Sequence, residues 1–343
     1  MAEISENKIT LKAPDDFHIH LRQAPGLAEY ARLTAEAGFA RAMVMPNTLP
    51  PVTEPAGMAA YKEEIQNAAG PGFTPLMTFK LMPGMTAAQV RALADAGAVA
   101  GKYYPAGATT NSSDGLTHWE LCADAMGEME RLGMVFSIHG EDPAGPALQR
   151  EQLFLPRFRE MAAAFPELKM VFEHISSAEG TEMVRELPDN VAATVTIHHL
   201  LLTQEDILGG ALAPHLFCRP LPKSDRDRRA IQDFVLTGSP KVFFGSDSAP
   251  HLKEKKECAS GAAGIFTSPV ALPLLIDFFE EKGRLDLLEA FVSEKGAAFY
   301  GLEENTCTVS FVKESWTVPA EYAGVVPFMA EKKLNWRPAC VGA

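Results

Sequence analysis

The sequence predicts an α/β protein whose strands close into a (β/α)8 barrel of the TIM type. Short runs rich in β-branched and aromatic residues alternate with longer stretches whose apolar residues recur at helical spacing. Eight such runs are present, and eight parallel strands close a barrel of this kind. The length of 343 residues is also ordinary for one such barrel.

The expected elements follow one another along the chain. The strands are predicted at residues 17–21, 41–45, 74–81, 98–104, 134–139, 169–175, 192–198 and 241–246. The clearest helices are predicted at residues 86–96, 116–132, 156–165 and 226–236. We expect one domain over residues 1–343, with the barrel at about 14–300 and a proline-containing covering segment at about 302–343. An open doubly wound sheet is the alternative, but it usually has fewer strands and a glycine-rich first turn, which this sequence lacks.

Charge and cysteine content limit the partners and the compartment. The net charge of −13 argues against nucleic acid or an anionic membrane as the main partner, but it allows a small anionic substrate. The acidic N-terminus has no apolar stretch of the signal-peptide kind, and no run approaches the length of a membrane span. A Cys-x-x-Cys pair is absent, so free thiols and a cytoplasmic location are expected. The cysteines are Cys122, Cys218, Cys258, Cys307 and Cys340.

The first predicted strand carries two histidines. In the stretch 15–22, strand alternation directs His18 and His20 to one side, followed by Arg22 on the same side. The apolar residues are expected on the other side: Phe17, Ile19 and Leu21. Two such imidazoles can bind one metal ion, although polar residues on a half-exposed strand would give the same short pattern.

Further polar residues fall at the ends of other strands. They are Asn47, Lys102, His139, His174 and Asp247. Each has a simpler explanation: His139 and His174 could bond to backbone carbonyls, and Asp247 could cap a turn. Lys102 would need a partner if it were charged and buried. Because the C-terminal ends of barrel strands converge on one face, the joint placement favours a metal centre there. His198 and His199 close the seventh predicted strand and could lie around the metal ligands, but a packing or hydrogen-bonding role is expected.

The motifs resemble those of the amidohydrolase superfamily, and specifically those of the single-function bacterial dihydroorotases. The similar segments occur in family order from residue 16 to beyond residue 260. They are Asp16-Phe17-His18-Ile19-His20-Leu21-Arg22, Met45-Pro46-Asn47-Thr48, Lys102-Tyr103-Tyr104-Pro105, Ala108-Thr109-Thr110-Asn111-Ser112-Ser113, His139-Gly140-Glu141, Phe172-Glu173-His174 and Gly245-Ser246-Asp247-Ser248-Ala249-Pro250-His251.

The resemblance implies a binuclear zinc centre and a homodimer. Its ligands would be His18, His20 and Asp247 for one zinc ion, His139 and His174 for the other, and Lys102 between both. Lys102 would be carboxylated on its side-chain nitrogen by carbon dioxide, because a neutral amine can add carbon dioxide and two dications stabilise the resulting carbamate. Imidazole nitrogen and carboxylate oxygen are also ligands that suit zinc.

The resemblance also implies a set of substrate contacts. Arg22, Asn47 and His251 match residues that bind the substrate carboxylate, and Thr109 and Thr110 match a loop, residues 105–115, that closes over the substrate. Ala263 and the backbone around Arg219 match contacts to the pyrimidine ring. Arg219 departs from the pattern, because an aliphatic residue is expected at this position.

The implied reaction is the reversible hydrolysis of L-dihydroorotate to N-carbamoyl-L-aspartate in pyrimidine biosynthesis. A hydroxide bridging the zinc ions would attack the ring amide, and Asp247 would move its proton to the leaving nitrogen. A hydantoinase or allantoinase would share the metal ligands but should lack the carboxylate-binding residues. A catalytically dead homologue in a larger assembly should have lost ligands, and a barrel enzyme without metal would leave the strand-end residues unexplained.

Overall fold

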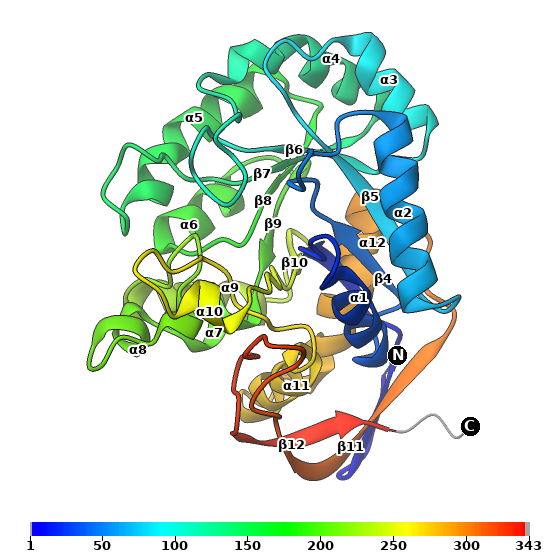
Figure 1. The fold of residues 1–343 in the computed structure, drawn as a ribbon, viewed down its shortest axis with the longest axis vertical. Coiled ribbons are helices and arrows are strands. Elements are labelled where there is room, and N and C mark those ends of the chain that lie inside the picture. The colour runs from blue at the N-terminus through cyan, green and yellow to red at the C-terminus, as the bar shows by residue number, and fades with distance from the viewer. Residues whose placement is uncertain (1, 340–343) are drawn as a thin grey trace.

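The protein folds as a barrel of eight parallel strands, shown in a computed structural model that describes residues 2–339 (Figure 1). The barrel strands are β3 (Asp15–Ile19), β4 (Arg41–Val44), β5 (Thr74–Lys80), β6 (Ala100–Tyr103), β7 (Val135–Ile138), β8 (Lys169–Phe172), β9 (Val191–Val195) and β10 (Val242–Phe244). Neighbouring strands in the sheet are neighbours in sequence, from β3 to β10. Each expected strand overlaps one of these, so the predicted fold class is confirmed.

Hydrogen bonds just beyond the strand ends join the first strand of the barrel to the last. The backbone nitrogen of Asp247 donates to the carbonyl of His18 at 2.8 Å, and that of His20 donates to the carbonyl of Ser248 at 2.9 Å. Closure of the barrel therefore places Asp247, more than two hundred residues away in sequence, directly beside the two histidines of the first strand.

Apolar side chains fill the barrel below this point. One cluster inside the ring includes Phe17, Val171 and Phe243 from the strands and Ala297 from helix α12 (Lys295–Tyr300). The expected alternation in the first strand is wrong for Phe17, because it belongs to this inner cluster, whereas Ile19 and Leu21 belong to the outer core. The pairing register of β3 shifts between Asp16 and Ile19, which breaks the simple two-residue period.

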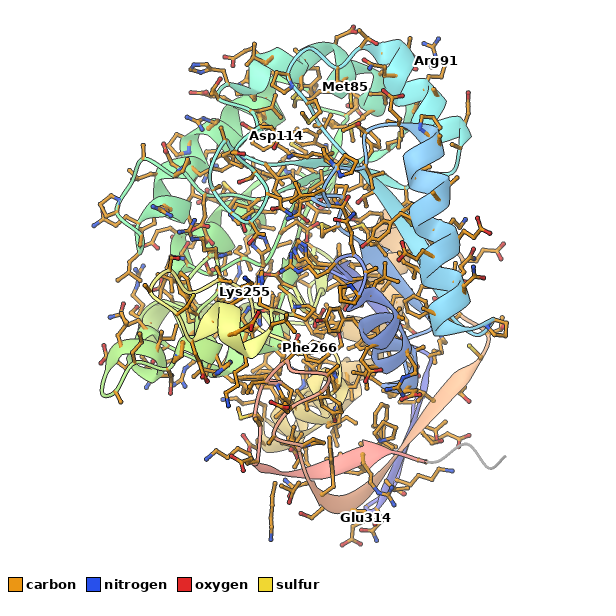
Figure 2. The ribbon with its side chains drawn as sticks, viewed as in Figure 1. Met85, Arg91, Asp114, Lys255, Phe266 and Glu314 are labelled. Carbon is orange, nitrogen blue, oxygen red and sulfur yellow. The ribbon has the colours of Figure 1, made fainter. Side chains whose placement is uncertain are left out.

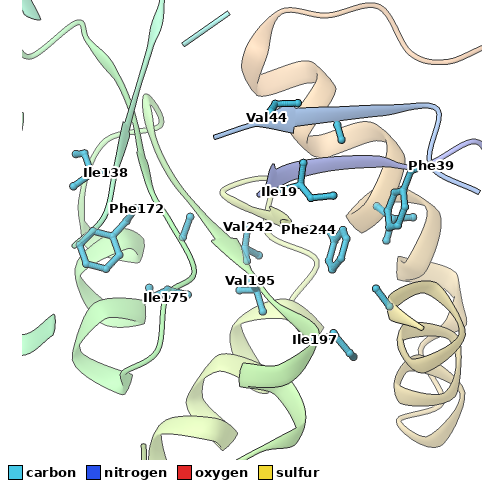
Figure 3. Packing of buried hydrophobic residues seen from close by; sticks show 14 of the residues in the cluster. Ile19, Phe39, Val44, Ile138, Phe172, Ile175, Val195, Ile197, Val242 and Phe244 are labelled. Carbon is cyan, nitrogen blue, oxygen red and sulfur yellow. The ribbon is translucent and has the colours of Figure 1, made fainter. Parts of the chain in front are cut away.

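A second, larger core lies between the strands and the surrounding helices. Figure 3 shows members of this core, among them Ile19 and Val44 from neighbouring strands and Phe244 from the last strand, whose ring stacks on Phe39 at 5.9 Å. The helices are α1 (Leu27–Glu36), α2 (Pro55–Ala69), α3 (Ala87–Asp95), α4 (Ala123–Leu132), α5 (Arg150–Ala164), α6 (Ala178–Glu186), α7 (Ile197–Leu201), α8 (Gln204–Leu208), α9 (Asp225–Leu236), α10 (Lys253–Lys256), α11 (Ala271–Glu281) and α12 (Lys295–Tyr300). Shorter 3-10 turns span Trp119–Cys122, Pro214–Leu216 and Leu285–Leu287, and a π-helical turn spans Ala290–Glu294.

The helix predictions succeed where capping residues mark the start. Helix α3 begins after Thr86, which forms a capping box with Gln89, and α9 begins after Ser224, which forms one with Asp227. Two other starts were wrong. The expected helix 116–132 is preceded by a 3-10 turn and starts only at Ala123, and the expected helix 156–165 already starts at Arg150 and runs through Pro156.

A small antiparallel sheet ties both ends of the described chain together. Its strands, in spatial order, are β1 (Glu3–Ile4), β2 (Lys8–Lys12), β11 (Thr308–Thr317) and β12 (Lys333–Pro338). It lies at the bottom of Figure 1, where β12 packs on α11. The segment expected to cover the barrel, 302–343, thus contributes two of these strands, while its Cys340 lies outside the described residues. Among residues 2–339, no helix combines the length and apolar character that spanning a membrane requires.

Candidate active site

Side chains from several strand ends line one narrow, polar cavity at the C-terminal face of the barrel. Its lining includes His18, His20, Arg22, Asn47, Tyr104, Thr109, Thr110, His139, His174, Arg219, Asp247, Ala249, Ala263 and Gly264. The structure thus brings together most of the residues singled out from the sequence. Lys102 and His251 are the exceptions, since they do not line this cavity. Lys102 lies fully buried, within 5.6 Å of the Tyr104 ring centroid.

A buried carboxylate orients His18. The Nδ1–H of His18 donates to Oε2 of Glu173 at 2.8 Å, and the other oxygen of Glu173 accepts from the hydroxyl of Ser137. Because a carboxylate only accepts, Nδ1 carries the proton and Nε2 presents its lone pair to the cavity. Burial lowers the pKa of His18 to about 4, which keeps its imidazole neutral near pH 7.

His20 is oriented by an amide in the same way. Its Nδ1–H donates to Oδ1 of Asn47 at 2.9 Å, while Nδ2 of Asn47 donates to the carbonyl of Thr110 at 2.9 Å. The free Nε2 of His20 lies 3.2 Å from Oδ1 of Asp247, and that of His18 lies 3.5 Å from the same oxygen. These three residues form one group of potential metal ligands.

His139 and His174 form a second group. Nε2–H of His139 donates to Oε2 of Glu141 at 2.8 Å, so its Nδ1 is free and lies 3.2 Å from Nε2 of His174. Burial lowers the pKa of His174, so it too is neutral. Nε2–H of His174 can donate to Nδ1 of His139 in one tautomer, and the same two nitrogens are close enough to be ligands of one cation.

The spacing of both groups fits zinc. Nitrogen ligands bind zinc at about 2.0–2.1 Å, so two ligands of a tetrahedral ion lie roughly 3.3 Å apart. The facing atoms of His139 and His174 are 3.2 Å apart, and Asp247 lies 3.2 Å and 3.5 Å from the two histidines of the first group. The donor set of imidazole and carboxylate is also one that zinc prefers.

Lys102 is a buried amine at the base of the strand-end residues. Its side chain is fully buried, and within residues 2–339 its Nζ has no hydrogen-bond partner. Burial lowers the pKa of Lys102 to about 8, which raises the fraction of neutral amine near pH 7. The charge on this amine contributes to the lowered pKa of His18 and to that of Glu173. The side chains that interact with this amine, the carboxylates of Glu173 and Asp247 and the ring of Tyr104, do so without a hydrogen bond.

Backbone conformation helps to direct these side chains into the cavity. His174, Asp247 and Arg22 have positive φ angles of 43°, 43° and 58°. This left-handed region is costly for residues other than glycine and is concentrated at functional sites. Here it lets the chain turn sharply where a strand ends.

Arg22 and His251 lie beside each other at the rim. Nη2 of Arg22 is 3.0 Å from Nε2 of His251, and Nε of Arg22 donates to the carbonyl of Pro250 at 3.1 Å. Nε2 of His251 also lies 2.9 Å from the carbonyl of Ala263. The guanidinium of Arg22 borders the cavity, whereas His251 lies behind it.

The loop 105–115 borders the cavity through Thr109 and Thr110 and has several contacts to the rest of the barrel. Thr110 is held by Asn47, and Nη1 of Arg219 donates to the carbonyl of Ala108 at 3.1 Å. Lys80 adds an ion pair with Asp114 on the same loop (labelled in Figure 2). The unexpected arginine at position 219 therefore contacts the loop through its side chain.

His198 and His199 were expected at the end of a strand, but they lie in helix α7. The strand β9 ends at Val195, and Thr196 caps the helix. With Cys218 they form another buried group of possible ligands. Both ring nitrogens of His199 already have partners, Thr196 at 2.8 Å and the carbonyl of Pro220 at 3.0 Å. This group is therefore a poorer metal site than the strand-end groups.

Two carboxylates and a tyrosine at the site were not predicted from the sequence as functional residues. Glu173 and Glu141 each accept a hydrogen bond from a cavity histidine, and Tyr104 lines the cavity. The available signal was that Glu173 is an acid inside an otherwise apolar strand run directly before His174.

An eight-stranded barrel with neutral histidines, an aspartate and an unpartnered lysine at its C-terminal face defines an enzyme of the amidohydrolase superfamily. Similar proteins narrow this class. The chain is 43% identical to a dihydroorotase of Marinobacter nauticus over 341 residues, which cover 97% of this chain and 99% of the relative. It is 44% identical to a dihydroorotase of Teredinibacter turnerae over 340 residues, covering 96% and 98% of the two chains. No family model matches the chain.

Solved structures agree with these relatives. A dihydroorotase of Campylobacter jejuni superposes with a TM-score of 0.91 at 34% identity, covering 98% of each chain. A Saccharomyces cerevisiae dihydroorotase in complex with 5-fluoroorotic acid gives 0.92 at 30% identity, covering 97% of this chain and 98% of the other. An L-hydantoinase of Arthrobacter aurescens, at 18% identity and a TM-score of 0.82, covering 96% of this chain and 82% of the other, shares the fold. The chain belongs to the dihydroorotase family.

Proposed function

We propose that this chain interconverts L-dihydroorotate and N-carbamoyl-L-aspartate in pyrimidine biosynthesis, using two zinc ions. As a dihydroorotase-family member it is an enzyme, a hydrolase of a cyclic amide that acts on small molecules, and its family is metal-dependent. The observation that carries the zinc proposal is the pair of ligand groups with spacings of 3.2–3.5 Å. The unpartnered Lys102 amine supports its carboxylation as a bridging ligand.

The proposed ligands are those expected from the sequence. They are His18, His20 and Asp247 for one ion, His139 and His174 for the other, and Lys102 for both. Zinc bound there would supply a nucleophile from water at neutral pH and polarise the ring carbonyl. Asp247 would accept the proton of that water and pass it to the leaving ring nitrogen, since its carboxylate lines the cavity 3.2 Å from Nε2 of His20.

The substrate carboxylate is proposed to bind Arg22. Its guanidinium borders the cavity and stays charged, and it can hold a carboxylate through two hydrogen bonds. His251 and Asn47 support this position: His251 lies beside the guanidinium, and Asn47 fixes both His20 and the loop. Thr109, Thr110, Ala263 and the backbone at Arg219 are proposed as the remaining substrate contacts, because all of them border the same cavity.

Hydrolysis of L-dihydroorotate, with zinc counted per chain in the same preparation, tests the proposal. Turnover with about two zinc ions per chain, lost on chelation, is the expected result. Bound zinc without turnover would favour a hydantoinase-like activity, to be examined with cyclic amides that lack the carboxylate. The homodimer and the cytoplasmic location implied by the resemblance stay predictions.

A further inference from the structure

A buried lysine lies beneath two of the segments that line the cavity. We propose that Lys256 is a positioning residue whose ammonium acts as a fixed cation and holds segments 217–219 and 262–264 in the arrangement that contacts the substrate ring. The inference rests on the proposed function, because Arg219 and Ala263 are substrate contacts only under that function.

The ammonium of Lys256 has a complete set of backbone acceptors. Its Nζ donates to the carbonyls of Phe217 at 3.0 Å, Ala262 at 3.1 Å and Gly264. The three donors of an ammonium thus meet three carbonyl oxygens from two different segments. The residue is only 4% exposed, and burial lowers its pKa to about 8, so the group is charged near pH 7.

The two segments need such a partner because neither belongs to a helix or strand. Residues 217–219 and 261–264 are irregular, and a buried carbonyl without a partner is costly. They touch directly through one backbone hydrogen bond, from Gly264 to Phe217 at 2.9 Å. Lys256 adds a second connection between them, because its ammonium donates to Phe217 on one segment and to Ala262 and Gly264 on the other.

The anchored carbonyls belong to cavity-lining residues or lie close to them in sequence, and Gly264 itself lines the cavity. Ala262 and Gly264 flank Ala263, and Phe217 lies two residues before Arg219. Anchoring both neighbours restricts rotation of the peptide groups of Ala263, whose own carbonyl meets His251 at 2.9 Å. Gly264 has φ +150°, and an added Cβ would lie 2.4 Å from the carbonyl oxygen of Ala249, so this segment has little room to adopt another path.

Lys256→Met tests the proposal in the zinc-loaded enzyme, because it keeps the length of the side chain and removes the charge and its donors. We expect the KM for dihydroorotate to rise about tenfold, with a smaller change in kcat and unchanged zinc per chain, since substrate-contacting backbone is displaced while the metal ligands are not. The matched control is Lys255→Met, the same change at the exposed neighbour on α10 (labelled in Figure 2), which should match the wild type.

A second variant separates positioning from stability. Lys256→Ala removes the ammonium beside the three carbonyls, and added ammonium chloride should lower its KM toward the wild-type value, whereas sodium chloride at equal ionic strength should not. If Lys256→Met does not fold, Lys256→Ala is purified in ammonium buffer instead. The KM for dihydroorotate is then measured before and after the ammonium is removed.

A wild-type KM in Lys256→Met, even with a lower melting temperature, would overturn the inference, and so would a KM of Lys256→Ala that is indifferent to ammonium. Absence of dihydroorotate turnover in the zinc-loaded wild type would instead count against the proposed function.

Discussion

Glu173 accepts a hydrogen bond from Nδ1 of His18 at 2.8 Å, joining the sixth strand of the barrel to the first across its interior. Burial alone would raise the pKa of Glu173, but Lys102 and His18 outweigh it and lower the value to about 2. The hydrogen bonds from His18 and Ser137 also lower this pKa, and that part of the effect does not depend on the charge of Lys102, which carboxylation would remove. The hydrogen bond to a carboxylate increases the basicity of Nε2 of His18, the ring nitrogen that faces the cavity.

Glu173→Gln should weaken zinc binding while leaving the fold intact. The amide keeps the shape of the side chain but removes the charge that orients His18, and losses of this kind cost roughly 10–100-fold in metal affinity. Zinc retained per chain against a graded series of chelator concentrations measures the effect. Retention equal to the wild type at all concentrations would show that His18 does not need this carboxylate.

Asp247→Asn should lose most turnover and keep most of the metal. The amide oxygen can still face the cation, but it cannot carry a proton, and general acid–base groups contribute about 10²–10⁴-fold to rate. The measurement is kcat together with zinc content in the same sample. Normal kcat would rule out Asp247 as the proton carrier, and loss of zinc together with kcat would assign it chiefly to ligation.

Arg22→Met should raise the KM for dihydroorotate far more than it lowers kcat. The variant loses a charge-assisted contact to the substrate carboxylate worth roughly 1.5–3 kcal/mol, or about 10–100-fold in binding. A melting curve is the control, because Arg22 also bonds to the backbone at Pro250. An unchanged KM in a variant with wild-type stability would contradict the carboxylate assignment.

Arg219→Leu should make the loop 105–115 easier to open. The substitution removes the hydrogen bond to the Ala108 carbonyl and restores the aliphatic residue expected at this position. If loop opening limits product release, kcat rises or stays level while KM increases. Protease cleavage within residues 105–115 should become faster than in the wild type, and equal cleavage rates would show that Arg219 does not restrain the loop.

Acid should destabilise the metal-free protein between about pH 6.5 and pH 3. Burial, with nearby cationic side chains as a lesser cause, lowers the pKa of His199 and of His251 to about 3, below the unfolded value of 6.5. The unfolded state then binds more protons in this window, so the stability present above pH 6.5 is lost as the pH falls. The free energy of unfolding of the chelated protein, measured with urea at pH 7.5 and at pH 5, shows this loss. The exposed His118 offers the control substitution, His118→Gln, which should leave this pH dependence unchanged.

The sequence predicts the barrel because each strand is a short continuous apolar run. Such a run can be recognised from neighbouring residues alone. The candidate site follows from the same runs, since polar residues that end parallel strands must meet on one face. That reasoning needs only the order of the elements, which explains why His139 and Asp247 could be placed together without any knowledge of distances.

The features that escaped prediction depend on contacts between distant segments. The small sheet forms only when β2 meets β11, and neither strand shows a signal for its partner. His198 and His199 were misplaced because Thr196 ends the strand by capping a helix, which interrupts an apolar run. The role of Asn47 in orienting His20 is likewise a matter of three-dimensional position.

The pairing of β2 with β11 has a consequence for synthesis on the ribosome. Thr10 and Ser310 share a hydrogen bond of 2.8 Å although 300 residues separate them. At roughly 5–20 residues per second, the early strand waits about 15–60 s before its partner exists. During that interval Ile9 and Leu11, both buried in the finished protein, are exposed on an unpaired edge. Nascent chains should therefore depend on chaperones until late in translation, and chains cut short before residue 308 should aggregate.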